Sequence, residues 1–387
     1  MSLFLEHQYY YKDSNLSFKE RLLNLSWSYI AVILIIVGIG LSVLYSISNG
    51  NMDPLVTRQL YRFAFGMLLF TCLALSDLRV WLKYAYWLYG ISLLLLLAVD
   101  LGGFIGMGAQ RWLKLPLLGQ FQPSELMKIT LILALARYFQ SSSEQDVRTW
   151  RFLIIPLLMM VVPFFLICRQ PDLGTALMLA VVTVSLLFLV GVQIWKFVLF
   201  IGLSAIGCPL VWHFLHSYQK KRVLIFLNPE SDPLGAGYHI MQSKITLGSG
   251  GLFGKGFMQG TQSHLNFIPE NHTDFIFTVF AEEFGMIGSW FLLGLYLALI
   301  IMGCRMALKS RNFFGKILAL GLTVNFATYV FINISMVMGC APVVGIPLPL
   351  VSYGGSAMAV ILAGFGLIEC VYVNREMILT RQVSRSE

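Results

Sequence analysis

The sequence predicts an all-α polytopic membrane protein with about ten transmembrane helices. The chain has 387 residues, of which 57% are hydrophobic and 12% charged, whereas soluble globular proteins carry about 25% charged residues. Windows of about 20 mostly apolar residues, the length that crosses a bilayer, recur along the whole chain. We find ten, near 28–48, 59–76, 82–101, 123–139, 152–168, 173–192, 196–216, 274–304, 315–338 and 349–373. No soluble domain is visible, so we expect one membrane domain over 1–387.

The positive charges predict the orientation of these spans, because cytoplasmic loops are enriched in Lys and Arg. With the N-terminus inside, the inside loops hold Lys12, Lys19, Arg21, Arg79, Lys83, Arg137, Arg148, Arg151, Lys196, Arg305, Lys309, Arg311, Lys316, Arg375, Arg381 and Arg385. The short outside loops hold far fewer, namely Arg58, Arg111, Lys114 and Arg169. Residues 1–27 and 374–387 are therefore expected in the cytoplasm. The formal net charge of +8 is a topology signal and requires no nucleic-acid partner.

One loop is unusually long. Residues 217–273 separate the seventh and eighth spans and should form a large extracytoplasmic loop. Long loops in compact proteins are usually functional or disordered, and the patterned mixture of glycine, aromatic and apolar residues favours ordered re-entrant or interfacial structure. Its segment LGSGGLFGKGFMQG is not a phosphate loop, since Gly256 follows Gly254-Lys255 where Ser or Thr is needed. We expect closely packed or flexible backbone there, with Lys244 or Lys255 available to an anionic headgroup.

Cysteine and histidine spacing does not predict a metal centre. The six cysteines form no CxxC pair, which argues against a zinc site or a disulfide framework. No spacing of histidines and carboxylates matches a metal motif.

Ionisable residues inside apolar segments are functional candidates by default. Glu125 and Lys128 lie three residues apart in QPSELMK, so they share a helix face and can pair. They could be a mutually neutralised structural pair, a source of a local field in a polar cavity, or both. Upstream, Arg111 in GAQRW could bind a phosphate or sugar, or simply contact lipid headgroups.

Three further polar positions lie near the predicted outer side. Asp172 opens the sixth span, where an acidic residue suits a helix cap. Ser352 stands in PVVGIPLPLVSYGGS, where it could supply a donor, although shaping a broken helix is the alternative. In FIPENHTDFIFTVF, Asp274 directly precedes an apolar run and His272 lies two residues before it. A carboxylate in such a place is costly unless it is paired, solvated or used.

The predicted topology brings Arg111, Glu125, Lys128, Asp172, Asp274 and Ser352 to the same outer side. One well-placed carboxylate among several cations suits general-base chemistry on a hydroxyl with an anionic leaving group nearby. The residues alone therefore indicate a membrane enzyme or transporter that handles an anionic lipid.

At these residues the sequence resembles a known family. The matching blocks are GAQRWLKL, FQPSELMK, QPDLGTAL, GAGYHIMQSKITLGSGGLFGKGF, GTQSHLNFIPENHTDFIFTVFAEEFG and PVVGIPLPLVSYGGSA. Together they resemble the SEDS family (shape, elongation, division and sporulation) of peptidoglycan glycosyltransferases, and GYHIMQSKI, GTQS and PVVGIPLPL resemble its elongation members in particular.

The resemblance implies a ten-helix fold with cytoplasmic termini in the bacterial inner membrane, and lipid II polymerisation at its outer face. The essential aspartate of the family falls on Asp274, and its glutamate and lysine fall on Glu125 and Lys128. Such proteins work with a class B penicillin-binding protein in the elongation complex. Many relatives have an acid where this chain has Asn266, so no catalytic role is assigned to Asn266.

We therefore expect Asp274 to be the catalytic base, with Glu125, Lys128, Arg111, His272 and Ser352 as substrate-binding candidates. No resident metal is predicted, although a divalent cation, Mg²⁺ or Mn²⁺, could assist the leaving pyrophosphate. Two other classes of function stay open, a lipid II flippase and a non-catalytic scaffold for the transpeptidase.

Overall fold

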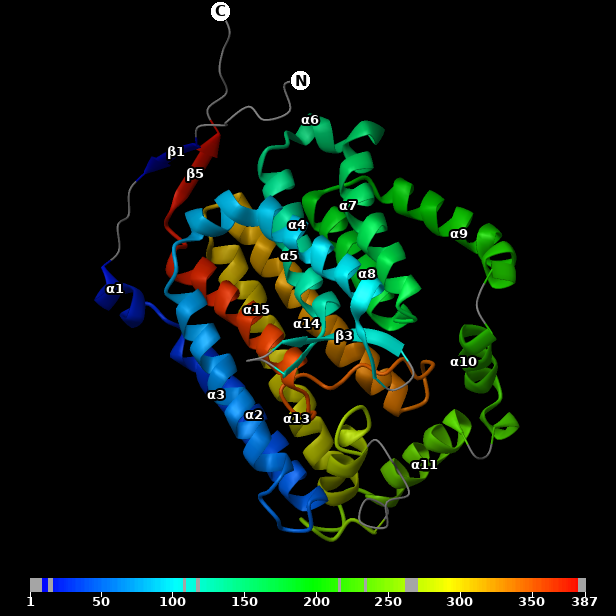
Figure 1. Ribbon diagram of the computed structural model, residues 1–387. Coiled ribbons are helices and arrows are strands. Elements are labelled where there is room, and N and C mark those ends of the chain that lie inside the picture. The colour runs from blue at the N-terminus through cyan, green and yellow to red at the C-terminus, as the bar shows by residue number, and fades with distance from the viewer. Residues whose placement is uncertain are drawn as a thin grey trace, which may run out of the picture.

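The structure, a computed structural model, describes residues 9–12, 17–106, 109–115, 119–214, 217–232, 235–261 and 271–381, and it confirms the helical membrane fold. Each predicted span corresponds to a helix (Figure 1). These helices are α2 (Trp27–Ile47), α3 (Leu55–Ala74), α4 (Leu78–Gly102), α5 (Pro123–Gln140), α7 (Trp150–Arg169), α8 (Leu173–Val190), α9 (Ile194–Phe214), α13 (Ile276–Lys309), α14 (Phe313–Val337) and α15 (Gly355–Val373). Seven of them, α2, α4, α7, α8, α13, α14 and α15, are long and apolar enough to cross a membrane.

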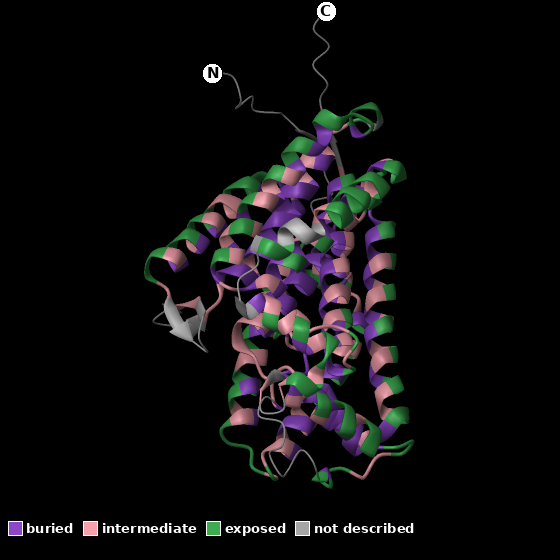
Figure 2. Cartoon of the chain, turned by 90° about the vertical axis from the view of Figure 1, so that its right-hand side faces the viewer, coloured by how far each residue is buried: buried purple, intermediate pink, exposed green. Residues whose placement is uncertain are grey.

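The core of the bundle is formed by α5, α14 and α15. Most of the side chains of these three helices are buried, whereas α4 and α7 bury only one face. Figure 2 shows the same division, with buried residues inside and exposed residues along the outer helices. The exposed residues of the outer helices are largely apolar, as expected of surfaces that face lipid.

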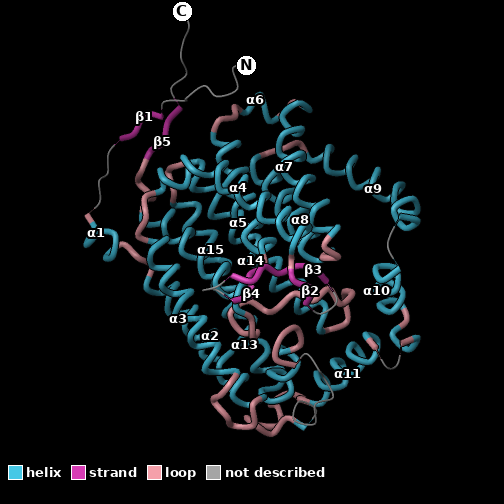
Figure 3. The backbone as a smooth tube through the Cα atoms, in the orientation of Figure 1, coloured by secondary structure: helices cyan, strands magenta, loops and turns pink. Residues whose placement is uncertain are grey.

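Short strands were not expected from the sequence, and two small sheets are present (Figure 3). One sheet joins β2 (Phe104–Gly106), β3 (Ala109–Leu115) and β4 (Gly119–Phe121) between α4 and α5. The other pairs β1 (Tyr9–Lys12) with β5 (Ile378–Arg381) in antiparallel register. Because β1 and β5 are the first and last described segments of the chain, these two segments lie at one end of the bundle, in agreement with the predicted even number of crossings.

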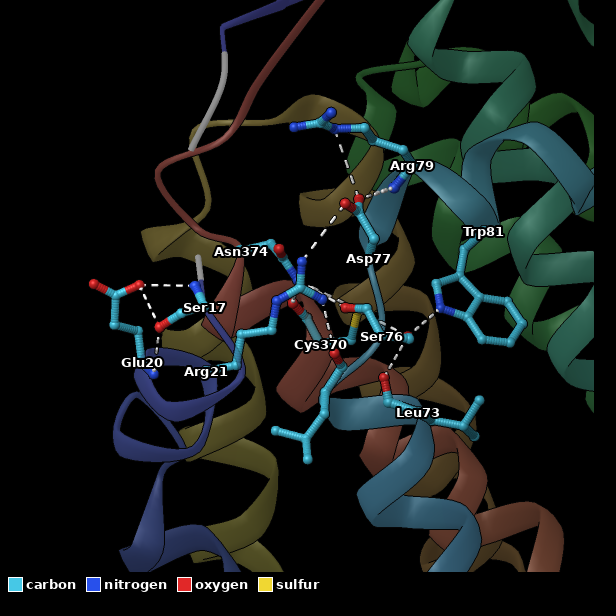
Figure 4. A network of polar contacts seen from close by, with 11 residues as sticks. Ser17, Glu20, Arg21, Leu73, Ser76, Asp77, Arg79, Trp81, Cys370 and Asn374 are labelled. Atoms are coloured by element: carbon cyan, nitrogen blue, oxygen red, sulfur yellow. Dashed lines mark hydrogen bonds and ion pairs between the residues drawn. The ribbon is translucent and has the colours of Figure 1, made fainter. Parts of the chain in front are cut away.

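A polar network ties the chain together at this end of the bundle (Figure 4). Arg21 in α1 (Phe18–Leu23) donates to Leu75 O at 2.7 Å and lies 3.6 Å from Asp77, the N-cap of α4. Cys370 of α15 and Asn374, the C-cap of this helix, both donate to Ser76 O at 3.3 Å. The turn between α3 and α4 is therefore held from both sides.

The long predicted loop is largely helical where it is described. It contains α10 (Ser217–Leu227), the 3₁₀ helix η1 (Pro229–Ser231) and α11 (Ala236–Ser249); the remaining short helix, α6 (Glu144–Val147), lies elsewhere, between α5 and α7. In Figure 1, α9 and α10 run along the margin of the molecule and α11 returns to the bundle. There the buried Ser243 hydroxyl donates to Val337 O at 2.7 Å.

Helix α13 bends back on itself at Gly285, whose φ of 67° and ψ of −164° are not helical. On one side of the bend, Thr273 O accepts a hydrogen bond from Ser352 at 2.6 Å. On the other side, Tyr296 donates to Pro349 O at 2.7 Å. A straight helix would hold Thr273 and Tyr296 about 34 Å apart. Pro349 and Ser352 are three residues apart and can span only about 10 Å of chain, so α13 cannot be straight even with the reach of the Tyr296 and Ser352 side chains. The second arm also lies against the first, because a Cβ at Gly288 would lie 2.4 Å from Phe284 Cβ and 3.6 Å from Phe280 Cζ.

The bend changes where the eighth membrane crossing begins. The second arm, residues 286–309, is about 36 Å long and is sufficient to cross a hydrocarbon core of about 30 Å. The first arm, residues 276–284, runs in the direction opposite to that of the second arm. From its hydropathy this span is predicted to begin at Asp274, at the edge of the membrane. The structure instead places the reversal at Gly285, because a hydrophobic run does not reveal a change of direction inside it.

The glycine-rich segment, residues 248–258, completes the bend. At the break, the amides of Met286 and Ile287 no longer bond the carbonyls of Glu282 and Glu283 four residues earlier. The segment supplies partners for all four groups. These bonds are Lys255 N to Glu282 O (3.0 Å), Gly256 N to Glu283 O (3.0 Å), Met286 N to Gly251 O (3.0 Å) and Ile287 N to Leu252 O (3.2 Å).

Glycine is needed for this backbone contact. A Cβ at Gly250 would lie 2.2 Å from Ala281 O, and one at Gly254 would lie 2.1 Å from Glu283 O. Of the two alternatives left by the sequence, close packing is therefore confirmed.

Candidate functional site

Asp274 lies in the turn before the first arm of α13 and is half-buried. Its backbone is held by Asn333 of α14, whose fully buried side chain donates to Asp274 O at 2.9 Å and to Ile346 O at 2.7 Å. Asn333 thus joins Asp274 to the 339–354 loop, which connects α14 and α15. The carboxylate faces Gly345 of this loop, where a Cβ would lie 3.4 Å from Asp274 Oδ2.

Ser352 fixes the same turn from the other side. Its hydroxyl donates to Thr273 O at 2.6 Å and accepts a hydrogen bond from Leu348 N at 2.7 Å. The single hydroxyl proton is therefore directed at the residue before Asp274. In this structure Ser352 shapes the loop and the turn, the alternative that the sequence left open for it.

His272 lies against Tyr353. Its carbonyl accepts from Tyr353 N at 2.9 Å, and the two rings meet edge to face with their centroids 5.8 Å apart. The guanidinium of Arg62, from α3, stacks over the ring of Tyr353, with its Cζ 4.3 Å from the ring centroid. Arg62 is not among the residues predicted from the sequence, although it is an ionisable residue within an apolar window, the same signal that indicated Glu125 and Lys128.

Glu125 and Lys128 form the predicted ion pair on α5. Lys128 Nζ lies 2.6 Å from Glu125 Oε1, and Lys128 is only 1% exposed. Tyr329 of α14, also buried, hydrogen-bonds both side chains through its hydroxyl. Tyr329 was not foreseen, because a tyrosine in an apolar helix gives no signal of its polar partners. The three groups satisfy one another, which makes the burial of two charges tolerable.

Arg111 and Asp172 meet at the turn between α7 and α8. Asp172 caps α8 by accepting from the hydroxyl of Thr175 at 2.9 Å and from its amide at 3.4 Å, which confirms the predicted cap. Arg111 donates to Gln170 O at 3.0 Å and lies 3.9 Å from Asp172. Its side chain remains 23% exposed, so it can still reach an anion.

Helix α14 connects these groups. Tyr329 and Asn333 lie one turn apart on it, so the Glu125–Lys128 pair and the Asp274 backbone contact the same helix face. The 339–354 loop in turn packs on α8, where a Cβ at Gly174 would lie 3.1 Å from Val344. The structure therefore brings the predicted residues to one region of the fold, around α14 and the 339–354 loop. Asn266 and Glu270 lie outside the described residues.

Among the described residues, no group of three or more His, Cys, Asp or Glu side chains lies close enough together to hold a metal ion.

The fold and the site define a multi-pass membrane protein with ionisable residues held between its helices. The family model of FtsW, RodA and SpoVE, described as "Cell cycle protein", matches residues 20–377, and the chain belongs to this family.

Several relatives are similar over most of their length. The peptidoglycan glycosyltransferase MrdB of Escherichia coli strain K12 is 45% identical over 335 residues, which is 86% of this chain and 89% of MrdB. The probable peptidoglycan glycosyltransferase FtsW of Trichlorobacter lovleyi is 38% identical over 297 residues, covering 76% of each chain.

Solved structures agree. A chain of a peptidoglycan synthase complex that coordinates polymerization and crosslinking superposes with a TM-score of 0.78 at 34% identity, covering 91% of this chain and 98% of that one. The rod shape determining protein RodA of Thermus thermophilus gives a TM-score of 0.67 at 30% identity, covering 91% and 97%.

Proposed function

We propose that this chain polymerises lipid II into β-1,4-linked glycan strands at the outer face of the bacterial cytoplasmic membrane. Its activity is that of a peptidoglycan glycosyltransferase, the name that its relatives carry. The observation that carries the assignment of the site is the turn of Asp274, which Asn333 and Ser352 hold from two sides.

Asp274 acts as the general base. Its carboxylate takes the proton from the 4-hydroxyl of the acceptor N-acetylglucosamine, and that oxygen attacks the anomeric carbon of the donor N-acetylmuramic acid. The bond to undecaprenyl pyrophosphate breaks as the new bond forms, so the configuration inverts and the pyrophosphate leaves with the electron pair. A positioned base contributes about 10²–10⁴-fold to the rate of such a step.

The cations have separate parts in this proposal. Arg111, partly exposed beside the α8 cap, is placed to contact the leaving pyrophosphate. Lys128 is buried against Glu125 and Tyr329, so it acts through the position of α14 and the local field. His272 lines the approach to Asp274 beside Tyr353.

The partner we propose is a class B penicillin-binding protein that crosslinks the new strand, within the elongation complex. The superposition on a chain of a polymerising and crosslinking complex supports this choice. The bias of Lys and Arg toward one side supports an outward-facing site.

The test is polymerisation by the purified Asp274→Asn variant with its partner. We expect a loss of about 10²–10⁴-fold in glycan product, with folding and lipid II binding retained. Asp232→Asn is the matched control, because Asp232 belongs to the same outer loop and pairs with the exposed Lys221. Near-normal glycan from Asp274→Asn would refute the assignment. Movement of lipid II across liposomes without polymer would instead support a flippase, and growth of cells carrying Asp274→Asn would support a scaffold.

A further inference from the structure

The bend of α13 carries a buried ion pair that the proposed mechanism does not use. Lys255 of the glycine-rich segment places Nζ 2.7 Å from Oε1 of Glu282 in the first arm. The Glu282 side chain is 0% exposed and that of Lys255 is 26% exposed. Thr261 joins them, with its hydroxyl 2.7 Å from the same Nζ. A carboxylate this deeply buried is costly without its cation, so the pair binds the segment to the arm.

The pair reinforces the four backbone bonds described above. Lys255 contributes twice, since its amide donates to Glu282 O while its side chain pairs with the carboxylate of the same residue. Next to it, Glu283 accepts from the hydroxyl of Ser46 near the end of α2. The end of the first arm that adjoins Gly285 is therefore fixed both to the glycine-rich segment and to α2 of the bundle.

Asp274 lies at the opposite end of the first arm, just before its first helical residue. Eleven residues separate Asp274 from Gly285, a length of about 16 Å if helical throughout. A tilt of about 4° at the bend would move Asp274 by about 1 Å, and a misplacement of that size can cost about 100-fold in rate. Asn333 and Ser352 hold the Asp274 end of the arm, so the arm is fixed at both ends. We therefore expect releasing the Gly285 end alone to lower the rate by less than about 100-fold.

We propose that Lys255 and Glu282, together with the glycine-rich segment, form a latch that sets the position of Asp274 by fixing the direction of the first arm. The inference rests on the proposed function, because it takes Asp274 as the base. Lys255 is on this account a positioning residue, which acts on the reaction through the arm.

The test compares Lys255→Met with Lys221→Met in the full-length protein with its transpeptidase partner. Lys221 is a suitable control because it also pairs with a carboxylate in the outer loop, Asp232, but is 66% exposed. Steady-state kinetics on lipid II give kcat and KM. Hydrogen–deuterium exchange of peptides covering 250–258 and 276–287 reports the latch without reference to activity.

For Lys255→Met we expect kcat to fall about tenfold, KM to stay within about twofold, and both peptides to exchange faster. Lys255→Arg keeps the charge and should restore kcat, whereas Lys221→Met should match the wild type in every readout. If Lys255→Met does not fold, the double variant with Glu282→Gln also removes the charge of the buried carboxylate and should show the same loss of kcat.

Two results would overturn the latch: an unchanged kcat when both peptides exchange faster, or a change confined to KM. These outcomes are separable from failure of the proposed function. An inactive Asp274→Asn with a fully active Lys255→Met refutes only the latch, whereas an active Asp274→Asn refutes the base itself.

Discussion

Replacing Gly285 with alanine should destabilise the protein more than replacing any other glycine of α13 with alanine. Its φ of 67° and ψ of −164° lie in a region that is essentially restricted to glycine and costs other residues about 1–3 kcal/mol. The new Cβ would lie 2.3 Å from Gly254 N and 2.7 Å from Leu252 O. Both contacts are backbone atoms, so no side chain can rotate away and the glycine-rich segment must be displaced.

The displaced segment would lose the four hydrogen bonds that it exchanges with α13, each contributing about 0.5–1.5 kcal/mol. With the dihedral strain, the expected loss is about 3–9 kcal/mol. The assay is the apparent thermal midpoint of the purified protein in one detergent, which should fall by at least about 5 °C. Gly294→Ala is the matched control: it lies in the same helix, a Cβ there meets nothing within 4 Å, and alanine should be neutral or stabilising by up to about 1 kcal/mol. A midpoint for Gly285→Ala within 1 °C of the wild type would refute the role given to the bend.

Two further predictions concern the site. Lys128→Met leaves Glu125 buried without its cation and should cost about 3–5 kcal/mol of stability. Adding Glu125→Gln should recover part of this loss. If the losses of the two single variants simply add in the double variant, the pairing is contradicted. Asn333→Leu removes the hydrogen bonds that this side chain donates to Asp274 O and Ile346 O, and should cost about 1–3 kcal/mol and lower kcat. Asn325→Leu on the same helix is the control expected to retain kcat, because the buried amide oxygen of Asn325 has no hydrogen-bond partner in the part of the chain that the structure describes. Equal kcat values for the two leucine variants would argue against the positioning of Asp274 by Asn333.

The sequence predicted the elements of the fold because each spanning segment must satisfy its own backbone in lipid. All ten apolar windows became helices, and local rules gave the Asp172 cap and the pairing of Glu125 with Lys128. Those interactions join residues three positions apart, so spacing alone defines them.

The glycine-rich segment shows where local rules stop. Its motif failed as a phosphate loop on spacing, and its glycines were consistent with either flexibility or close packing. The choice depended on α13, more than twenty residues further along the chain, whose broken hydrogen bonds the segment completes.

What the sequence determined by itself was the membrane class, the set of helices and the residues worth testing, because hydropathy, charge bias and short spacings are local properties. The bend at Gly285, the contacts of Tyr329, Asn333 and Lys255, and with them the way in which Asp274 is held, became apparent only from the folded structure. The physical reason is that each of these depends on partners distant in the chain, such as the 201 residues that separate Lys128 from Tyr329. Asp274 was chosen from the sequence, but the residues that hold it in place became visible only once the chain had folded.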